Sequence, residues 1–490
     1  MANKVNRLFF PHGSNLLIAG MAFILPLTAA IADVQPRNAS LNYSQKSLSN
    51  AGNPAAAALI VERKDPYVMT GGIIELGVGV EFGDLDELFE KIDELANDYR
   101  PPSEPVDPEL PPLPENPIRD YTWEDLFNEY PELEDRIDVV KDKAASTAAL
   151  IALIAAEGYG KAEATSNASF VLNEDLYGGT LLMGFAYKGN AKTVGIFESI
   201  EFDSEQAKSA LQTIPDFTED DPMQELDLSG GITLFYNPAN KHIKFTVEND
   251  SLLLVKSTKV GQFSLAYSKK AIENDYGTLF FGIKPSLYRV GLTNVSARLG
   301  EITDSEALFD DIKNANFIYK NGFDVDLGVV WSGANYQLGL SANNLIERTY
   351  KYPELDESGY TSAEVLGELD YHKQFTMQRQ IKLEAGIFTE QRQWSLHAEY
   401  DANPVEDPMR DRYQWFTITA GYAADSWWLP SARFGISRNL AGTQLGYLNA
   451  GVTIMKILNI DLATTLDTVT LDGNEMRRGA NIRIGVQFDY

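Results

Sequence analysis

Apolar and polar residues alternate along most of the chain from about residue 163 to its end. In one example Phe323, Val325, Leu327, Val329 and Trp331 alternate with Asp324, Asp326 and Gly328. A period of two is typical of strands with one apolar face, and the runs here are about 8–12 residues long. Asn321-Gly322 and Asp472-Gly473 are hairpin-turn signals. Without helices long enough to join parallel strands, the pattern predicts an antiparallel sheet.

The alternation also occurs once earlier, over residues 68–82, which we expect to form the first strand. Residues 83–162 then interrupt it. Their apolar residues fall at helical spacing, and this apolar stripe consists of Leu85, Leu88, Phe89, Ile92 and Leu95. The all-apolar stretch within 148–156 is too short to span a bilayer, so we expect it to pack against that stripe.

The same insertion is acidic and rich in proline. From Glu81 to Ala145 there are 21 acidic and 6 basic residues, a net charge of −15. Eight of the 17 residues from Pro101 to Pro117 are proline, which favours an extended polyproline spacer. A charge run of this kind is typical of a solvated surface, and a surface that binds cations or a partner is the alternative.

Three features favour one membrane-spanning barrel over a soluble sandwich. The strand region exceeds 300 residues without an internal restart, which suits one closed sheet of about 14 strands. Aromatic residues near strand ends fit girdles at the lipid–water interfaces; they are Tyr413, Trp415, Tyr422, Trp427, Trp428 and Tyr447. The final strand alternates to the last residue, with apolar positions at Ile482, Ile484, Val486, Phe488 and Tyr490. That last pattern resembles the C-terminal assembly signal of bacterial outer-membrane barrels.

The first 32 residues have the features of a cleaved secretory signal peptide. Lys4 and Arg7 precede an apolar run from Leu16 to Leu27, and Ala30-Ile31-Ala32 forms a cleavage signal. We therefore expect export to the outer membrane of a Gram-negative bacterium. The predicted organisation is a signal peptide at 1–32, an N-terminal segment at 33–66 and a barrel at 67–490, interrupted by the 83–162 insertion.

The composition of the chain argues against several kinds of partner and functional site. The 490 residues include 41 Lys plus Arg and 70 Asp plus Glu, for a net charge of −29, which argues against a nucleic-acid partner. The absence of cysteine excludes disulfides and thiolate metal sites. His242, His372 and His397 are scattered, and no hydrolase, zinc-protease or nucleotide-binding motif is present. We predict no enzyme activity, no cofactor and no metal site.

Residues 43–60 are rich in Ser, Gly and Ala and end shortly after Asn53-Pro54-Ala55. This segment resembles the N-terminal hatch that plugs the 14-stranded barrels of the long-chain fatty-acid transporters, and Asn53, Pro54 and Ala55 match their motif. The chain is more similar to the conjugal-transfer TraF-type barrels, which share the exported hatch, the glycine-rich first strand and an acidic helical insertion. The cysteine-free sequence excludes the unrelated thioredoxin-like protein of the same name.

Two functional hypotheses follow. A hatch-plugged channel for fatty acids or other hydrophobic molecules predicts an apolar pocket beside Asn53-Pro54, but the 83–162 insertion departs from the fatty-acid transporters. An interaction or display protein, as the conjugation resemblance implies, predicts a filled lumen and an exposed insertion. The expected partners are outer-membrane lipid, the barrel-assembly machinery, and either hydrophobic molecules or envelope and conjugation proteins. An even strand number and a periplasmic C-terminus would place residue 83 outside the cell or back in the lumen.

Overall fold

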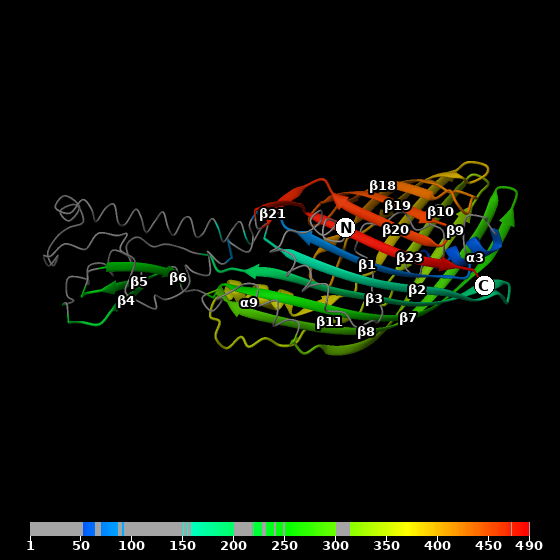
Figure 1. The fold of residues 1–490 in the computed structure, drawn as a ribbon. Coiled ribbons are helices and arrows are strands. Elements are labelled where there is room, and N and C mark those ends of the chain that lie inside the picture. Colours follow the sequence, from blue (N-terminus) through cyan, green and yellow to red (C-terminus); the bar gives the residue numbers. More distant parts are fainter. Residues whose placement is uncertain are drawn as a thin grey trace.

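In a computed structural model, the described residues close into one antiparallel barrel of fourteen strands (Figure 1). These residues are 52–63, 70–86, 91–92, 150, 154, 158–199, 218, 220–227, 232–239, 242–247, 250–299, 314–471 and 473–489. Closure is made by the first and last strands, which pair from Gly72↔Phe488 to Glu81↔Gly479. The predicted fold class is therefore confirmed, including the strand number.

The barrel strands follow chain order around the wall, because each pairs with the next barrel strand in the sequence. They are β1 (Gly72–Phe82), β2 (Gly160–Leu176), β3 (Gly179–Ile196), β7 (Leu252–Asn274), β8 (Gly277–Arg298), β9 (Ile318–Ser332), β10 (Tyr336–Asn343), β13 (Gln380–Phe388), β14 (Trp394–Asp401), β17 (Trp415–Tyr422), β18 (Ser431–Asn439), β19 (Gly446–Ile454), β20 (Leu458–Thr465) and β23 (Gly479–Phe488).

Several predicted boundaries differ from those observed. β1 begins at Gly72, and β2 begins at Gly160, so that its first three residues lie inside the predicted insertion. β7 and β8 have 23 and 22 residues, about twice the predicted strand length, and their inner faces pack against side chains from residues 350–377. The hairpin predicted at Asn321-Gly322 is wrong, since both residues lie within β9 and pair with β8. The other predicted turn is correct, with Gly473 at φ +69° between β21 and β22.

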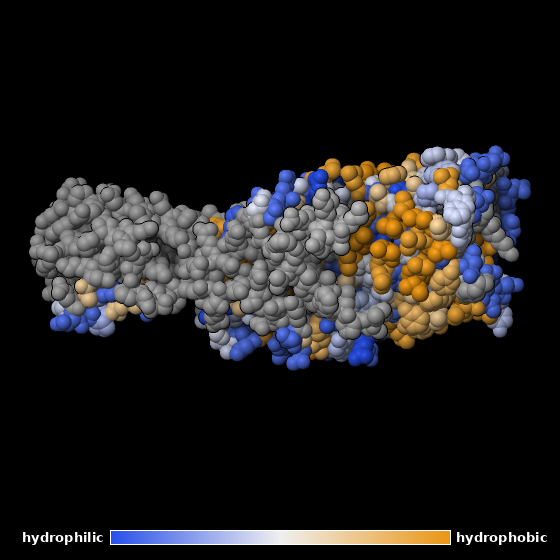
Figure 2. All heavy atoms as spheres, viewed as in Figure 1, coloured by the Kyte–Doolittle hydropathy of each residue, from blue (hydrophilic) through white to orange (hydrophobic). Residues whose placement is uncertain are grey.

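Alternation sorts the side chains between lipid and lumen. On β1 the outward residues Ile74, Leu76 and Val78 are about half exposed, and on β18 so are Phe434 and Ile436. Figure 2 shows hydrophobic residues gathered on the visible face of the barrel, with hydrophilic residues at the right-hand end of the view. A closed sheet with an apolar outer belt leaves no backbone group unpaired in lipid. Within the described residues, no helix has the length and apolarity to cross a bilayer.

The aromatic residues predicted to form girdles divide into two groups. Tyr422 contacts Trp394 on the outer face with the two rings tilted by 50°, and Trp427 and Trp428 are exposed in the connection that follows β17. Tyr413, Trp415 and Tyr447 instead lie inside the barrel, buried in one aromatic cluster. The girdle prediction is wrong for these three, because the alternation of their strands turns their rings inward.

The two ends of the barrel differ in their connections. At one end the strands are joined by short links, at 177–178, 275–276, 333–335, 389–393, 423–430 and 455–457. At the other end lie 83–159, 197–251, 299–317, 344–379, 402–414, 440–445 and 466–478. Outer-membrane barrels have short turns in the periplasm and long loops outside. The connection from β1 to β2 therefore leaves and re-enters the barrel at the long-loop end, where the small sheet of β4 (Gln224–Asp227), β5 (Ile232–Asn237) and β6 (His242–Val247) also lies (Figure 1).

Other short elements lie within or beside the barrel. At the short-turn end is α3 (Ala56–Arg63). In the long loops are α9 (Ala363–His372) and three two-stranded ribbons. These pair β11 (Thr349–Lys351) with β12 (Gln374–Thr376), β15 (Val405–Glu406) with β16 (Arg412–Tyr413), and β21 (Thr468–Leu471) with β22 (Asn474–Arg477).

An apolar cluster at the long-loop end holds the base of the insertion. Leu85 and Ile92 pack with Ile154, together with Phe197 from the connection after β3 and Val469 of β21. The expected contact between the apolar stripe and the 148–156 run is thus observed for these residues. Leu88, Phe89, Leu95 and the proline-rich 101–117 lie outside the described residues, as do the predicted signal peptide and Tyr490.

Candidate functional site

Asn53 joins the N-terminal segment to the barrel wall. Its side-chain Nδ2 donates to the carbonyl oxygens of Val329 and Leu340, at 3.3 and 3.2 Å. Those two residues face each other across β9 and β10. Its Oδ1 accepts a hydrogen bond from the amide of Ala55 at 3.0 Å, which orients the turn into α3. One amide side chain thus pins the segment to two strands and shapes its own turn.

Two glycines make the wall flat where this segment lies. Gly282 on β8 and Gly328 on β9 are directly opposite each other. A Cβ atom on Gly282 would lie 2.3 Å from the carbonyl carbon of Pro54, and one on Gly328 would lie 2.1 Å from Asn53 Oδ1. No real side chain tolerates such contacts, so only glycine permits this close approach. We call Asn53, Pro54, Ala55, Gly282 and Gly328 the hatch seat.

The helix that follows packs its small side chains against the inner wall. Ala55, Ala56, Ala58 and Leu59 form a buried cluster with Phe280 and Val330. On the other side of the helix, Ala57 packs with Val171, Leu182 and Ala266. The amide of Ala58 donates to Ser268 Oγ at 2.8 Å. Apart from the half-exposed pair of Glu62 with Lys270, these contacts are neutral.

A second segment fills the lumen at the long-loop end. Residues 402–414 connect β14 to β17, yet they bind β2, β3 and β7 on the opposite side of the barrel, through two carboxylates and one backbone carbonyl. We call this segment the strut. Asp407 and Met409 are buried at 3% and 1% exposure, so the strut is packed inside the barrel rather than lying over its rim.

The strut is held by three lysines from three neighbouring strands. Lys161 Nζ lies 2.6 Å from Asp407 and 3.0 Å from Asp411, and it also contacts the hydroxyl of Tyr413. Lys192 forms an ion pair with Asp411. Lys256 donates to the Pro408 carbonyl oxygen at 3.1 Å. These five charged side chains form a buried network that crosses the lumen.

The network also shifts the pKa values of two side chains on the loops, Asp411 and His372. Burial by itself would raise the pKa of Asp411, but the ammonium groups of Lys161 and Lys192 hold it well below its usual range. Burial, and then the nearby charge of Lys256, lowers the pKa of His372 at the end of α9 to about 3. Asp411 is therefore charged and His372 neutral near pH 7.

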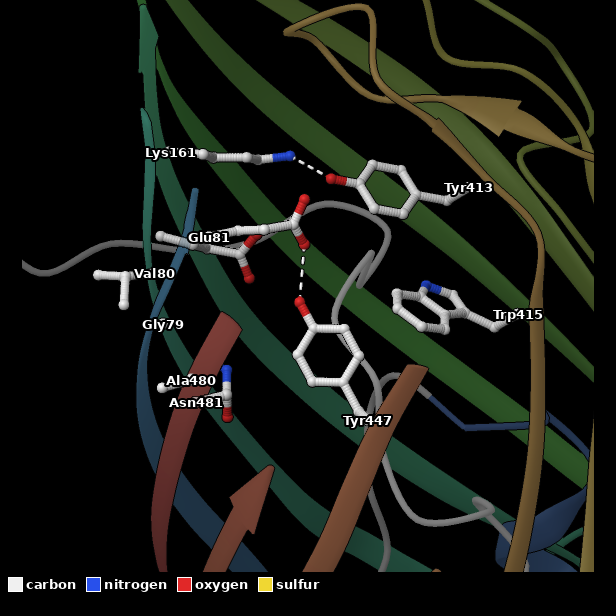
Figure 3. A pocket seen from close by; sticks show the side chains of 10 residues that line it. Gly79, Val80, Glu81, Lys161, Tyr413, Trp415, Tyr447, Ala480 and Asn481 are labelled. Carbon is white, nitrogen blue, oxygen red and sulfur yellow. Dashed lines mark hydrogen bonds between the residues drawn. The ribbon is translucent and has the colours of Figure 1, made fainter. Parts of the chain in front are cut away.

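A small pocket of about 30 Å³ lies between the strut and the wall of β1, β2 and β23 (Figure 3). Glu81 projects into it and accepts hydrogen bonds from the hydroxyls of Tyr159 and Tyr447, both at 2.8 Å. Tyr413 and Trp415 close the opposite side. This pocket is polar and aromatic, and neither Asn53 nor Pro54 lines it.

Helix α9 and the β11–β12 ribbon, which both belong to the long loops, also pack against the inner wall. Val365 and Leu369 of α9 pack on Ile196, Leu252 and Leu254. The β11–β12 ribbon contributes Tyr350 and Phe375 to a cluster on the inner faces of β7 and β8. Asp250 anchors the start of α9 by accepting hydrogen bonds from the amide of Ser362 at 2.6 Å and from Thr361.

The remaining predicted residues are spread over the fold. Ile482, Ile484 and Val486 face outward in the apolar belt, and Phe488 lies 6.1 Å from Phe170 between ring centroids. His397 is buried on the inner face of β14, His372 ends α9 and His242 begins β6. Within the described ranges there is no group of three or more acidic, histidine or cysteine residues that could hold a metal ion.

Sequence patterns alone did not identify the lysines or Asp407 and Asp411. Lys161 is 246 positions from Asp407 in the chain, and no motif links residues so far apart. A weak signal does exist in retrospect. The run Asp407-Pro408-Met409-Arg410-Asp411 places two carboxylates on one tight turn, within a loop between two amphipathic strands.

Comparisons with known proteins give one family match and several solved structures of low similarity. Residues 50–401 match the family described as F plasmid transfer operon, TraF, protein. Among solved structures, the toluene transporter TbuX of Ralstonia pickettii is 10% identical, with a TM-score of 0.33 and coverage of 94% of this chain and 99% of that one. A Pseudomonas aeruginosa FadL homologue is 13% identical, with a TM-score of 0.31 and coverage of 94% and 100%.

A search of curated proteins finds no match. The family match covers more than two thirds of the sequence and includes Asn53, the insertion and the barrel strands from β1 to β14. The described part of the chain is an outer-membrane type of barrel with an apolar belt and a polar interior. The chain therefore belongs to the TraF family of the F plasmid transfer operon.

Proposed function

We propose that this protein is an exported outer-membrane barrel that displays its 83–162 insertion to a partner in the envelope or on another cell. The observation that carries the proposal is the strut, which crosses the lumen and binds the opposite wall through buried ion pairs. A barrel whose interior is filled by its own loops is suited to hold a structure in place rather than to conduct solutes.

The attachment of the insertion supports a display role. Its base is buried in the apolar cluster around Leu85 and Ile154. The β21–β22 ribbon adds polar contacts, because the Thr470 amide donates to Asp86 at 2.5 Å and Arg478 lies 3.0 Å from Asp84. These contacts fix the start of the insertion to the barrel, so that binding forces on it would be transmitted to the membrane anchor.

The charge of the insertion indicates the chemistry of its partner. A net −15 over 81–145 favours a partner surface rich in Lys and Arg, which would be attracted over a Debye length of about 10 Å at 0.1 M salt. Binding should then weaken as salt rises. The long-loop end that carries the insertion is the end expected outside the cell.

The display proposal can be tested with protease on whole cells. We expect cleavage within 101–117 on intact cells, with the barrel fragment retained in the outer membrane. Replacing 101–117 by a Gly-Ser linker of equal length is the matched control for cleavage at that site. Cleavage only after permeabilisation would contradict an exposed insertion. A variant with 93–149 replaced by a short linker should still assemble in the membrane. Cells that carry it should lose conjugal transfer or contact with the partner.

The hatch seat favours a second function, uptake of hydrophobic molecules past a displaced hatch. Asn53 and Pro54 contact the inner wall as a luminal plug would. If uptake is the function, deleting 33–60 should increase entry of hydrophobic solutes and single-channel conductance in planar bilayers. Unchanged permeability in that deletion, with normal barrel assembly, would leave display as the better supported function.

A further inference from the structure

The three lysines that hold the strut form a row across three neighbouring strands. Lys161 on β2 is the register partner of Lys192 on β3, and Lys192 is the partner of Lys256 on β7. All three side chains point into the lumen. Glu81 on β1 pairs with Lys161 and ends the row on one side. The row therefore places three lysines and one glutamate on adjacent rungs of the sheet.

Such an arrangement is unfavourable in the absence of anions. Like charges directly opposite each other on a sheet repel, and a buried lysine needs a compensating charge. The strut supplies two carboxylates. Asp411 bridges Lys161 and Lys192, and Asp407 binds Lys161. Without them the wall would present a net charge of about +2 to the lumen.

Lys256 is not matched by a carboxylate in the described part of the chain. Its ammonium is fully buried, and it contacts the Pro408 carbonyl, His372 Nδ1 at 3.5 Å and the ring of Tyr352 at 4.2 Å. A carbonyl dipole and an aromatic face compensate an ammonium less well than an anion does. Lys256 is thus the one lysine of the row that the strut contacts through a carbonyl oxygen rather than a carboxylate.

We propose that the lysine row is an anion-binding site, and that Asp407 and Asp411 occupy it as an internal mimic of its ligand. The ligand is a small, soluble dianion, a diphosphate or dicarboxylate, with its two anionic groups about 5 Å apart to match the spacing of neighbouring strands. Its binding displaces the strut and opens the long-loop end of the lumen.

The geometry explains why two anionic groups are required. The row spans about 10 Å across three strands, so one carboxylate reaches two lysines at most. A dianion with the stated spacing contacts all three, including Lys256, and so replaces both strut carboxylates while adding the missing partner. A monoanion of the same class replaces only one of them and leaves the strut bound.

This proposal goes beyond the display function, because it assigns a ligand and an opening step to a lumen that is otherwise filled. It does not depend on what the insertion binds. Failure of the protease or partner experiments above would not affect it, and its own test uses purified protein in nanodiscs.

The test uses the absence of native cysteine. Met409, 1% exposed at the strut, is replaced in the variant Met409→Cys, and its maleimide labelling rate is measured with sodium diphosphate or succinate. If the dianion binds only the open state, a concentration ten times its dissociation constant raises the rate about tenfold. Sodium acetate and sodium chloride at matched ionic strength should leave the rate unchanged.

Further variants on the Met409→Cys background separate the site from general loosening. Asp407→Asn with Asp411→Asn should speed labelling without any dianion and tighten diphosphate binding measured by calorimetry. Lys256→Gln should weaken the dianion response. Lys284→Gln is the matched control, because Lys284 is equally buried in the lumen and pairs with Asp326 outside the row.

Three outcomes would overturn the proposal. If neither dianion changes the labelling rate of Met409→Cys, while the variant that also carries Asp407→Asn and Asp411→Asn is labelled quickly, the row binds no such ligand. An equal rise in labelling rate with sodium chloride would show that the effect comes from ionic strength alone. A full response in Lys256→Gln, together with its loss in Lys284→Gln, would place the anion elsewhere in the lumen.

Discussion

The hatch seat and the strut contact the inner wall of the barrel near its opposite ends, by different physical means. At the short-turn end, Asn53 and the alanines of α3 fit a wall from which side chains have been removed at Gly282 and Gly328. At the long-loop end, Asp407 and Asp411 reach across the lumen to buried lysines. One closure depends on shape and neutral hydrogen bonds, and the other depends on charge.

This difference determines what can open each closure. A neutral, close-packed contact is indifferent to small ions and responds to changes in volume or to an apolar competitor. Buried ion pairs are costly when broken but can be exchanged for other ions of the same sign. The two ends of the barrel can therefore respond to different stimuli.

The largest effect is expected from removing a charge from the strut. Asp411→Asn leaves two buried lysines short of a partner, which should destabilise the strut by about 3–5 kcal/mol. Hydrogen exchange over 405–413 should rise, while exchange at α3 stays slow. Asp425→Asn is the control, because its pair with Lys456 is surface-exposed. Equal protection of the strut in both variants would contradict a charge-based closure.

A smaller loss is expected from adding one methyl group to the hatch seat. Gly328→Ala places a Cβ atom against Asn53 and Pro54, which should cost about 1–3 kcal/mol through overpacking. The readout is hydrogen exchange at α3, which should rise while the strut remains protected. Gly446→Ala is the matched strand control, since a Cβ atom there would meet no other atom within 4 Å. A similar result for both glycines would argue that the close approach has no energetic importance.

Asn53→Ala tests the hydrogen-bonding part of the same closure. It removes the donors to Val329 and Leu340 without adding volume, and should cost about 1–2 kcal/mol. Because these contacts are neutral, the change in thermal midpoint should not vary with salt. A strong salt dependence would show that the hatch seat is held by charge after all.

The smallest effect concerns pH and is confined to the loops at the long-loop end. His372 has a pKa lowered to about 3 by burial and by Lys256, with Lys192 and Arg410 adding to the effect and Asp411 opposing it. Between pH 6.5 and 3 the unfolded chain therefore binds the extra proton, so the stability of α9 falls as the pH falls. From pH 6.5 to 5.5 the loss is at most about 1 kcal/mol.

Hydrogen exchange over 363–372 at pH 7 and 5.5, corrected for intrinsic rates, measures this loss. His372→Gln should flatten the pH dependence of α9, whereas α3 has no histidine and should not change. If the hydrogen exchange of α9 depends on pH equally in wild type and in His372→Gln, another titratable group controls the stability of α9.

The alternation of residue types was enough to predict the barrel because it assigns each residue to one face of a strand. Phe323 and Leu327 lie outside and Asp324 and Asp326 inside, as the period of two requires. Asn53-Pro54 was identified as a motif, and its contacts with the wall were anticipated. Its role as a hatch stays a prediction, as does the assembly role of the last strand.

By itself, then, the sequence determined the strand faces, the single large sheet and the acidic break after the first strand, since these depend on neighbours within about ten residues. Only the tertiary structure decided that Lys161, Lys192 and Lys256 share one row, because strand register is set by pairing between distant segments. It also decided that Tyr413, Trp415 and the strut turn into the lumen. Loops have no periodic pattern to reveal their direction, and closure of the barrel places their partners on the far wall.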